Sequence, residues 1–214
     1  MYFYKVAGTL SIKKKYYIEI IYLSQLPFYM DNENIQLETE RLILNSLSYK
    51  DIPKITAYLQ NPKISENVIN IPFPYSEKDA IFWINLGNQG RESKEVYNFA
   101  IRLKEDEKLN FIGAIGIRLD KKHNKAELGY WLGEPFWGKG FMSEATKRII
   151  KFGFEILELN KINATHFLHN PASGKIMIKN KMIKEAEIKE HFKKGDIYLD
   201  IIQYRLTRKE YKNL

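Results

Sequence analysis

A stretch in the middle of the chain, where a strand pattern leads into a glycine-rich loop and then a helix pattern, constrains the fold most. AELGYWL (126–132) is typical of a strand, EPFWGKG (134–140) of a loop, and SEATKRIIKFGFEIL (143–157) of a helix with apolar residues close to a 3.6-residue period. A helix start offers free backbone N–H groups and the positive end of its dipole, and glycines let the backbone approach an anion. The stretch therefore predicts a pyrophosphate-binding loop, with a simple tight turn as the alternative.

The patterns on both sides of this stretch predict a single α/β domain of the α+β kind. Ser76 with Asp79 forms a capping-box pattern, Asp51 is a candidate N-cap, and Asn61-Pro62 is expected to end a helix. We expect elements in the order β-α-α-β-β-β-α-β-α-β-β, at residues 36–47, 50–59, 76–86, 96–103, 110–119, 126–132, 143–157, 161–168, 170–180, 182–188 and 197–206.

Residues 1–30 differ from the remainder and are interpreted as an N-terminal extension to a domain at 31–214. A run of lysines (13–15) precedes the apolar stretch YYIEIIYL, as in a signal peptide, but Glu19 interrupts that stretch and no small-residue cleavage site follows. The extension is therefore expected to be an added β element, a disordered arm, or sequence upstream of a translation start at Met30.

The composition excludes several kinds of chemistry. The 214 residues include no cysteine, which excludes disulfide bonds, thiolate metal ligands and a thiol nucleophile. The formal net charge is +8, but the basic residues are scattered, so a solvated surface explains the charge as well as an acidic partner or RNA does. No apolar run approaches the roughly 18 residues of a membrane-spanning helix. We therefore expect a cytoplasmic protein with no membrane partner.

At the central stretch the chain resembles the GNAT superfamily of acetyltransferases, and more closely its RimJ/RimL-like branch of ribosomal-protein N-acetyltransferases. The resemblance covers about residues 36–212 and is carried by LETERLIL (37–44), AELGYWL, WGKGFMSEATKRII (137–150) and NPASGKIMIKN (170–180). It implies a single GNAT-like domain with a mixed, mostly antiparallel sheet of about six or seven strands flanked by helices. It also implies acetyl-coenzyme A (acetyl-CoA) as cosubstrate and gives no reason to expect a metal.

The resemblance assigns the coenzyme A pyrophosphate to the amides of the loop 137–142. In the family this loop begins with Gln or Arg, whereas here Trp137 stands at that position, Met142 replaces a small residue, and Gly140 fits the pattern. Lys139 is a candidate ligand of a coenzyme A phosphate, with a solvated loop lysine as the alternative. The expected cofactor-binding residues are Tyr130, Trp131, Leu132, Trp137, Gly138, Lys139, Gly140, Phe141, Met142, Asn170 and Ser173.

Transfer of an acetyl group to an amine needs a hydrogen-bond donor near the thioester carbonyl and a route for the proton of the amine. By resemblance, the strand 126–132 diverges from the strand 161–168, and the amides near Trp131 and Leu132 meet the thioester carbonyl and the pantetheine arm. Glu127 shares a strand face with Trp131 and is the candidate general base, acting directly or through water. The alternative is an edge carboxylate paired with a lysine.

Asn170 and Ser173 precede a helix, where simple capping accounts for both residue types. The resemblance instead places Asn170 against the pantetheine and Ser173 near the sulfur, where its hydroxyl can hydrogen-bond the leaving thiolate. Many family members carry a tyrosine general acid seven positions after the asparagine, and here that residue is Met177. Ser173, Tyr130 or water must then supply the proton.

Phe73, Tyr75 and Trp83 lie where the family builds its acceptor pocket, although aromatic residues there also serve as packing. The expected acceptor is a primary amine, namely a ribosomal-protein N-terminus, a peptide or a small amine, which attacks directly in a ternary complex. A homodimer is compatible with this interpretation. His166 and His169 are three positions apart on a predicted strand, so they point to opposite faces and are not expected to bind a metal.

Two other functions stay open. A basic RNA- or protein-binding module would cluster Lys and Arg with aromatic residues on one sheet, whereas the lysines here are dispersed and no RRM or KH signature is present. A GNAT fold that binds acyl-CoA without turnover is compatible with Met177 and the unusual loop, while Glu127 and Ser173 favour catalysis.

Overall fold

The computed structural model describes residues 35–105 and 110–214. The predicted extension at 1–30 lies outside these residues. Within the two described ranges, no helix is both long enough and apolar enough to cross a membrane.

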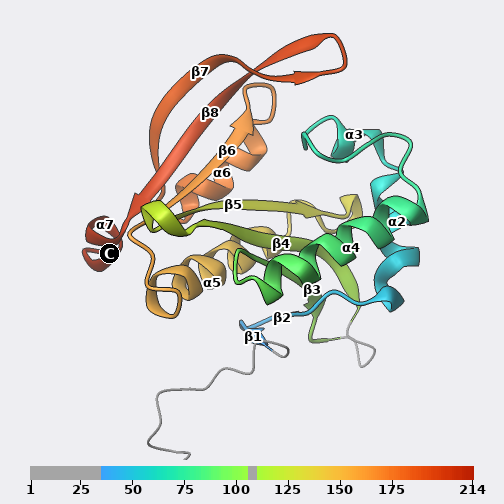
Figure 1. The fold of residues 1–214 in the computed structure, drawn as a ribbon, viewed down its shortest axis with the longest axis horizontal. Helices are drawn as coiled ribbons and strands as arrows, with labels where there is room; N and C mark the ends of the chain where they lie inside the picture. Colours follow the sequence, from blue (N-terminus) through green and yellow to red (C-terminus); the bar gives the residue numbers. More distant parts are fainter. Residues whose placement is uncertain (1–34, 106–109) are drawn as a thin grey trace, which may run out of the picture. The chain divides into compact units, whose positions relative to one another are not determined.

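The described residues form one mixed sheet in the order β1-β2-β3-β4-β5-β6-β8-β7 (Figure 1). Neighbouring strands are antiparallel except β5 and β6, which are parallel. This arrangement confirms the predicted fold class. The strands are β1 (Leu37–Glu38), β2 (Leu42–Asn45), β3 (Val96–Leu103), β4 (Phe111–Asp120), β5 (Lys125–Leu132), β6 (Lys161–Phe167), β7 (Ile183–Lys194) and β8 (Ile197–Thr207).

The sheet has eight strands, one more than the upper predicted number, because the stretch 36–47 divides into β1 and β2. Thr39 closes the turn between them: its hydroxyl accepts the backbone N–H of Leu42 at 2.9 Å, and its own N–H donates to the Leu42 carbonyl at 3.0 Å. Leu37 of β1 is therefore the pairing partner of Leu44 of β2 in the antiparallel ladder.

The helices depart from the predicted pattern mainly at their ends. Asp51 stands at the predicted N-cap position of α2, but its side chain makes no capping hydrogen bond to that helix. Its carboxylate instead accepts the N–H of Ser48 at 2.9 Å and pairs with Arg102 at 2.8 Å. Ser76 and Asp79 form the expected capping box. The short helices α3 and α7 were not predicted. The helices are α2 (Ile52–Leu59), α3 (Pro62–Ser65), α4 (Glu77–Glu92), α5 (Phe141–Glu155), α6 (Pro171–Lys179) and α7 (Arg208–Lys212), with 3-10 turns η1 (Tyr49–Asp51), η2 (Lys121–His123) and η3 (Glu134–Phe136).

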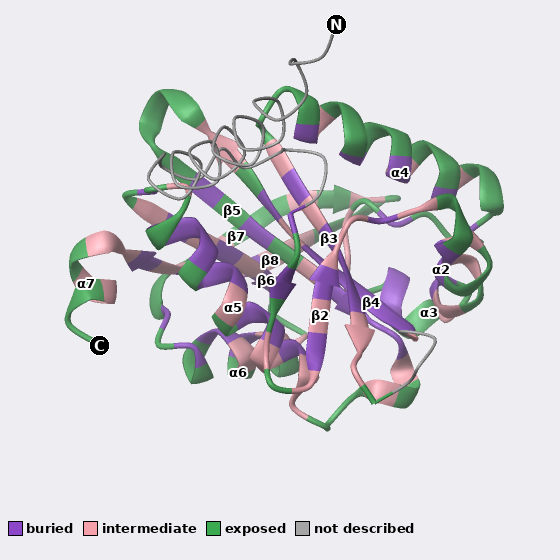
Figure 2. Ribbon diagram, turned by 90° about the horizontal axis from the view of Figure 1, so that it is seen from below, coloured by how far each residue is buried: buried purple, intermediate pink, exposed green. Residues whose placement is uncertain are grey.

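Helices cover both faces of the sheet, and the alternation of side chains along β3 shows how (Figure 1, Figure 2). Ala100 belongs to a buried cluster with Ile55 of α2 and Ile84 of α4. Phe99, its neighbour in sequence, points the other way and packs edge-on against Phe152 of α5, with ring centroids 5.7 Å apart. The sheet therefore lies between two helical layers, with α2 and α4 on one face and α5 and α6 on the other, and its buried side chains pack against both layers.

The long hairpin of β7 and β8 reaches the segment that follows α3. Lys194, next to the hairpin turn, donates from Nζ to the carbonyl of Val68 at 2.8 Å and also to that of Ser65. Burial lowers the pKa of Lys194, while Glu66 acts in the opposite direction. Phe192 of the same hairpin, Ile64 of α3 and Val68 after it all line one cavity, so the hairpin and the α3 region together border it.

Candidate active site

A cavity of about 1120 Å³ opens where β5 and β6 diverge. The parallel pairing runs from Lys125–Lys161 to Leu128–Ala164 and ends there, whereas β5 stays paired with β4 as far as Leu132. The divergence expected between the strands 126–132 and 161–168 is therefore present. Beyond Leu128 and Ala164, the edges of β5 and β6 that face each other are not paired with another strand of the described chain.

The glycine-rich loop lies at the mouth of this gap and leads into α5. Gly138 and Gly140 have φ angles of +74° and +82°, a region in which residues with a Cβ are strained. Gly140 is the N-cap of α5 and supplies no side-chain cap, and the helix begins at Phe141, two residues before the predicted start. The first-turn N–H groups of α5 are thus available beside the cavity, which both glycines line.

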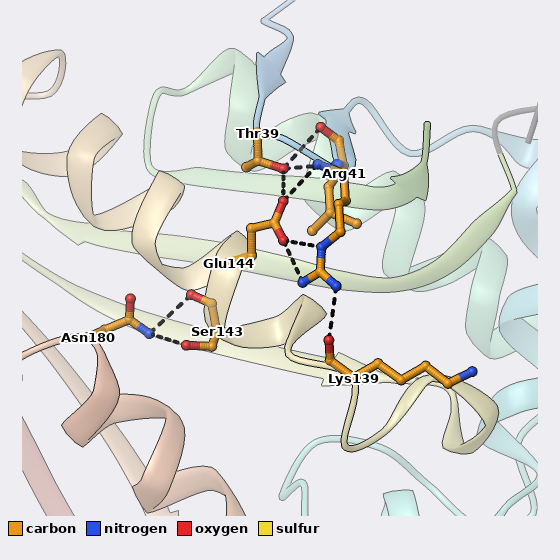
Figure 3. Close-up of polar contacts among 7 residues, drawn as sticks. Thr39, Arg41, Lys139, Ser143, Glu144 and Asn180 are labelled. Carbon is orange, nitrogen blue, oxygen red and sulfur yellow. Dashed lines mark hydrogen bonds and ion pairs between the residues drawn. The ribbon is translucent and has the colours of Figure 1, made fainter. Parts of the chain in front are cut away.

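A network that the sequence analysis missed holds this loop in place (Figure 3). The Glu144 carboxylate accepts from the Thr39 hydroxyl at 2.6 Å and from Nε of Arg41 at 2.7 Å. Arg41 also donates from Nη1 to the Lys139 carbonyl at 3.1 Å. Burial acts to raise the pKa of Glu144, but the hydrogen bonds from Thr39 and Arg41 outweigh it and the pKa is lowered. The charged pair therefore joins the β1–β2 turn to both the loop and α5.

A second contact in Figure 3 joins the start of α5 to the end of α6. Asn180 donates from Nδ2 to the backbone carbonyl of Ser143 at 3.2 Å and to its hydroxyl at 3.3 Å. These two helices, which both border the cavity, are thus tied together close to the glycine loop.

Tyr130 and Ser173 meet across the gap. The Tyr130 hydroxyl lies 3.0 Å from Oγ of Ser173 and donates to the Ser173 carbonyl at 3.2 Å. Burial raises the pKa of Tyr130 to about 12, which the contact with Ser173 only partly opposes. Asn170 accepts the Ser173 N–H at 3.3 Å, which is the capping contact that the simpler interpretation expected. Met177 is fully buried.

Glu127 lies on the opposite face of β5 from Tyr130. It is exposed, lines the cavity, stands across from Arg118 on β4 and is adjacent to Asn163 on β6. In the described part of the chain no lysine or arginine comes within 4.0 Å of its carboxylate. The edge carboxylate paired with a lysine, the alternative to a general base, is therefore not the observed arrangement.

Aromatic residues surround the end of β5. The Trp131 ring is buried, with its centroid 6.3 Å from that of Trp83. Tyr75 is also buried, and burial raises its pKa to about 12. Both Trp83 and Tyr75 line the cavity, whereas Phe73 is 55% exposed and is absent from the described lining. Of the three expected acceptor-pocket residues, the structure brings Tyr75 and Trp83 to the cavity and does not bring Phe73 there.

The remaining residues expected to bind the cofactor lie around the loop. Trp137 donates from Nε1 to the Leu132 carbonyl at 2.7 Å, so its indole links the loop to the end of β5. The Lys139 ammonium lies 5.8 Å from the centroid of the Phe136 ring. Leu132 and Met142 are buried, Phe141 packs under the Arg41 guanidinium at 4.5 Å, and Trp137, Phe141 and Met142 all line the cavity.

The two histidines singled out from the sequence lie at the end of β6. His166 is buried with its ring stacked on Tyr204, and its Nδ1 lies 2.8 Å from the Phe167 carbonyl. His169 follows the strand and stacks on Phe167. Both rings thus contact aromatic neighbours.

Comparison with known proteins gives matches along most of the chain. The model of the acetyltransferase (GNAT) domain matches residues 41–183. An uncharacterized N-acetyltransferase p20 of Bacillus licheniformis is 32% identical over 82% of this chain and 97% of its own length. The ribosomal-protein-serine acetyltransferase of Escherichia coli is 27% identical over 78% of this chain and 92% of its own length.

A solved structure has the same fold at lower identity. The spermidine N-acetyltransferase of Vibrio cholerae, in complex with CoA and spermine, superposes with a TM-score of 0.69 at 22% identity. The superposition covers 82% of this chain and 100% of that one.

Proposed function

Because this chain belongs to the acetyltransferase (GNAT) family and is an N-acetyltransferase, we propose that it moves the acetyl group of acetyl-CoA to a primary amine. In this proposal the amine attacks directly in a ternary complex. The observation that carries the proposal is the gap between β5 and β6, which leads to a glycine loop at the start of α5. A backbone arranged in this way fits an elongated cosubstrate with a pyrophosphate at one end.

The loop residues suit the pyrophosphate. A Cβ added at Gly138 would meet nothing within 4 Å, so the space beside this backbone is open to a ligand. We assign the anion to the amides of Gly138, Gly140, Phe141 and Met142, and a phosphate to Lys139. The Arg41 network keeps these amides in place before the ligand arrives, which lowers the cost of ordering them on binding.

The ends of β5 and α6 suit the pantetheine and the thioester. We assign the β5 backbone near Trp131 and Leu132 to the thioester carbonyl and the pantetheine, with the Leu132 N–H, which points away from β4, as the donor. Asn170 and Ser173 are assigned to the arm and its sulfur. The indole N–H of Trp137 donates to the Leu132 carbonyl, and this hydrogen bond holds the end of the β5 backbone in position. CoA is bound in the solved spermidine N-acetyltransferase, and the shared fold supports the same cosubstrate here.

Two groups are assigned to the proton transfers. Glu127, which has no ion-pair partner in the described residues, takes the proton of the amine directly or through water. Tyr130 stays protonated at neutral pH because its pKa is about 12, and its contact with Ser173 supplies a hydrogen-bond donor on the side of the leaving thiolate. In this assignment Tyr130 and Ser173 take the place of the tyrosine general acid whose position Met177 occupies.

The acceptor is assigned to the part of the cavity that Tyr75 and Trp83 line. Related acetyltransferases have names that specify a ribosomal-protein serine or spermidine, so both a protein N-terminus and a small amine are candidates.

The first experiment is a calorimetric titration of the purified protein with acetyl-CoA and, separately, with NAD and ATP. We expect micromolar binding of acetyl-CoA only. Binding followed by thiol release with an amine supports the enzyme, whereas binding without thiol release for a broad amine panel supports the non-catalytic acyl-CoA-binding alternative. No binding of acetyl-CoA contradicts the proposal.

A further inference from the structure

The part of the cavity that α3, α4 and β7 line is walled mainly by apolar side chains. Ile64 and Val68 come from α3 and the segment after it, Phe82 and Leu86 from α4, and Phe192 from β7. Phe82 and Leu86 are 68% and 48% exposed, although a neighbouring stripe of the same helix is buried. Large apolar side chains that stay exposed beside a cavity form a surface that the apolar body of a ligand can cover.

The charged side chains that line the cavity also favour an acceptor with a single positive charge. Among the described residues only two carboxylates line the cavity, those of Asp79 and Glu127. Asp79 already accepts the backbone N–H of Ser76 at 2.8 Å and its hydroxyl at 2.5 Å. Both contacts fall on Oδ2 of Asp79, as part of the cap of α4, whereas Glu127 makes no such contact with the described residues. Four cations line the same cavity, so its described lining carries a net positive charge: they are Lys63, Arg118, Lys175 and Lys179.

A polyamine fits this lining poorly. It brings at least one further ammonium group besides the amine that reacts, and taking an ammonium group out of water is costly unless an acceptor pairs with it. The described lining sets four cations against two carboxylates, one of which, Asp79, already caps α4, so it compensates a second ammonium group poorly. A monoamine has one charge, which Glu127 can meet, and an apolar body that matches the wall.

From these observations, and resting on the proposed acetyl transfer, we infer that the acceptor is a primary monoamine with an apolar or aromatic body. Its amino group lies at Glu127 and its body lies against Phe82, Leu86 and Trp83. Two sources share this chemistry: a free arylalkylamine, and a peptide whose N-terminal residue has a large apolar side chain.

The test compares thiol release from acetyl-CoA with five acceptors: phenethylamine, ethanolamine, spermidine, and two peptides that differ only in their first residue, phenylalanine or serine. We expect kcat/KM to be roughly tenfold higher, or more, for phenethylamine or the phenylalanine peptide than for the other three. A higher value for phenethylamine than for the phenylalanine peptide identifies a small-molecule acceptor, and the reverse identifies a protein N-terminus.

Substitutions on α4 test whether this wall binds the acceptor. Phe82→Ala shortens an exposed side chain, so the fold is expected to persist. Ile81→Ala is the matched control, because Ile81 is 40% exposed on the same helix and is not part of the described lining. We expect Phe82→Ala to raise KM for the apolar amine about tenfold and to leave KM for acetyl-CoA unchanged. Ile81→Ala is expected to change neither value.

Three results would overturn the inference and leave the binding of acetyl-CoA intact. They are a higher kcat/KM for spermidine or ethanolamine, equal effects of the two substitutions, and acetyl-CoA binding without turnover of either apolar amine. Failure to bind acetyl-CoA in the calorimetric titration is a separate outcome, which removes the proposed function and this inference together.

Discussion

At the scale of single residues, the two groups assigned to proton transfer lie on opposite faces of β5. Glu127 faces the same side as Trp131, whereas Tyr130 faces Ser173 on α6. Tyr130 is held by burial and by a hydrogen bond, while Glu127 is exposed beside the cavity. Because they share no contact, each group can be substituted without disturbing the other.

Replacing Glu127 tests the general base. Glu127→Gln keeps the size of the side chain and removes its ability to accept a proton, so we expect kcat at pH 7 to fall roughly 10²- to 10⁴-fold. The loss should shrink as the pH approaches the pKa of the amine, because the amine then needs no base. Thiol release gives the rate, and calorimetry should show unchanged affinity for acetyl-CoA.

Glu92→Gln is the control for this substitution, since Glu92 is an exposed carboxylate near the end of α4. Equal rates for Glu127→Gln and the parent protein at pH 7 would remove Glu127 from the mechanism.

The conformation of Gly140 gives a second test. With φ at +82°, Gly140→Ala places a Cβ in the left-handed region, which should destabilise the protein by about 1 to 2 kcal/mol and weaken acetyl-CoA binding. Gly195→Ala introduces similar strain at φ +59° in the β7–β8 turn, away from the described cavity lining. Chemical denaturation and calorimetry should show comparable stability losses, with weaker binding only for Gly140→Ala. Weaker binding in both variants would contradict a specific role of the loop.

At the scale of elements, the contact of Arg41 with Glu144 joins a turn near the start of the described chain to the helix that borders the cavity. Both side chains are partly buried, with 36% and 19% of their surface exposed. The pair therefore helps to order the short loop between η3 and α5.

Replacing Arg41 should affect both stability and ligand binding. We expect Arg41→Met to cost about 1 to 3 kcal/mol of the free energy of unfolding, because it leaves Glu144 without its cation. It should also weaken acetyl-CoA binding, since the Lys139 carbonyl loses its donor. The control is Lys151→Met, whose exposed pair with Glu155 should contribute only about 0.5 kcal/mol. Urea denaturation that gives equal losses for the two variants would contradict this role.

The elements that the sequence predicted best are those whose patterns are local. The alternation in β3 and β4 and the capping box of α4 need only neighbouring residues, and all three were placed within a few residues of their observed ends. The division of 36–47 into two strands was missed because it depends on the contact of the Thr39 side chain with Leu42.

The contacts that shape the site were harder to predict, because they join distant parts of the chain. Arg41 and Glu144 are 103 residues apart, and Tyr130 and Ser173 are 43 apart, so no local period indicates either pair. The available signal was the resemblance itself, since LETERLIL and SEATKRII contain Arg41 and Glu144. Whether an aromatic side chain is buried likewise depends on tertiary packing. Residue type alone therefore could not show that Tyr75 is buried and Phe73 is exposed.

At the scale of the whole molecule, buried tyrosines should limit stability in alkali. Burial raises the pKa of Tyr75 and of Tyr130 to about 12, above the value of about 10 in an unfolded chain. Their contribution is therefore fully present below pH 10 and is lost as the pH rises to about 12, by about 2 to 3 kcal/mol for each group. Denaturation midpoints between pH 9 and 12 should fall less steeply in Tyr75→Phe and Tyr130→Phe. Unchanged steepness in both variants would contradict this assignment.

The separation of β5 from β6 gives the sheet a pair of edges in its interior. An outer edge is open to the strand of any other chain, whereas these two face each other and share a root at Leu128 and Ala164. In the proposed function, a thin, amide-bearing chain such as pantetheine would lie between these two inner edges and use their backbone groups. Recognition of a linear cosubstrate by backbone would then leave the side chains of this region free to change with the acceptor.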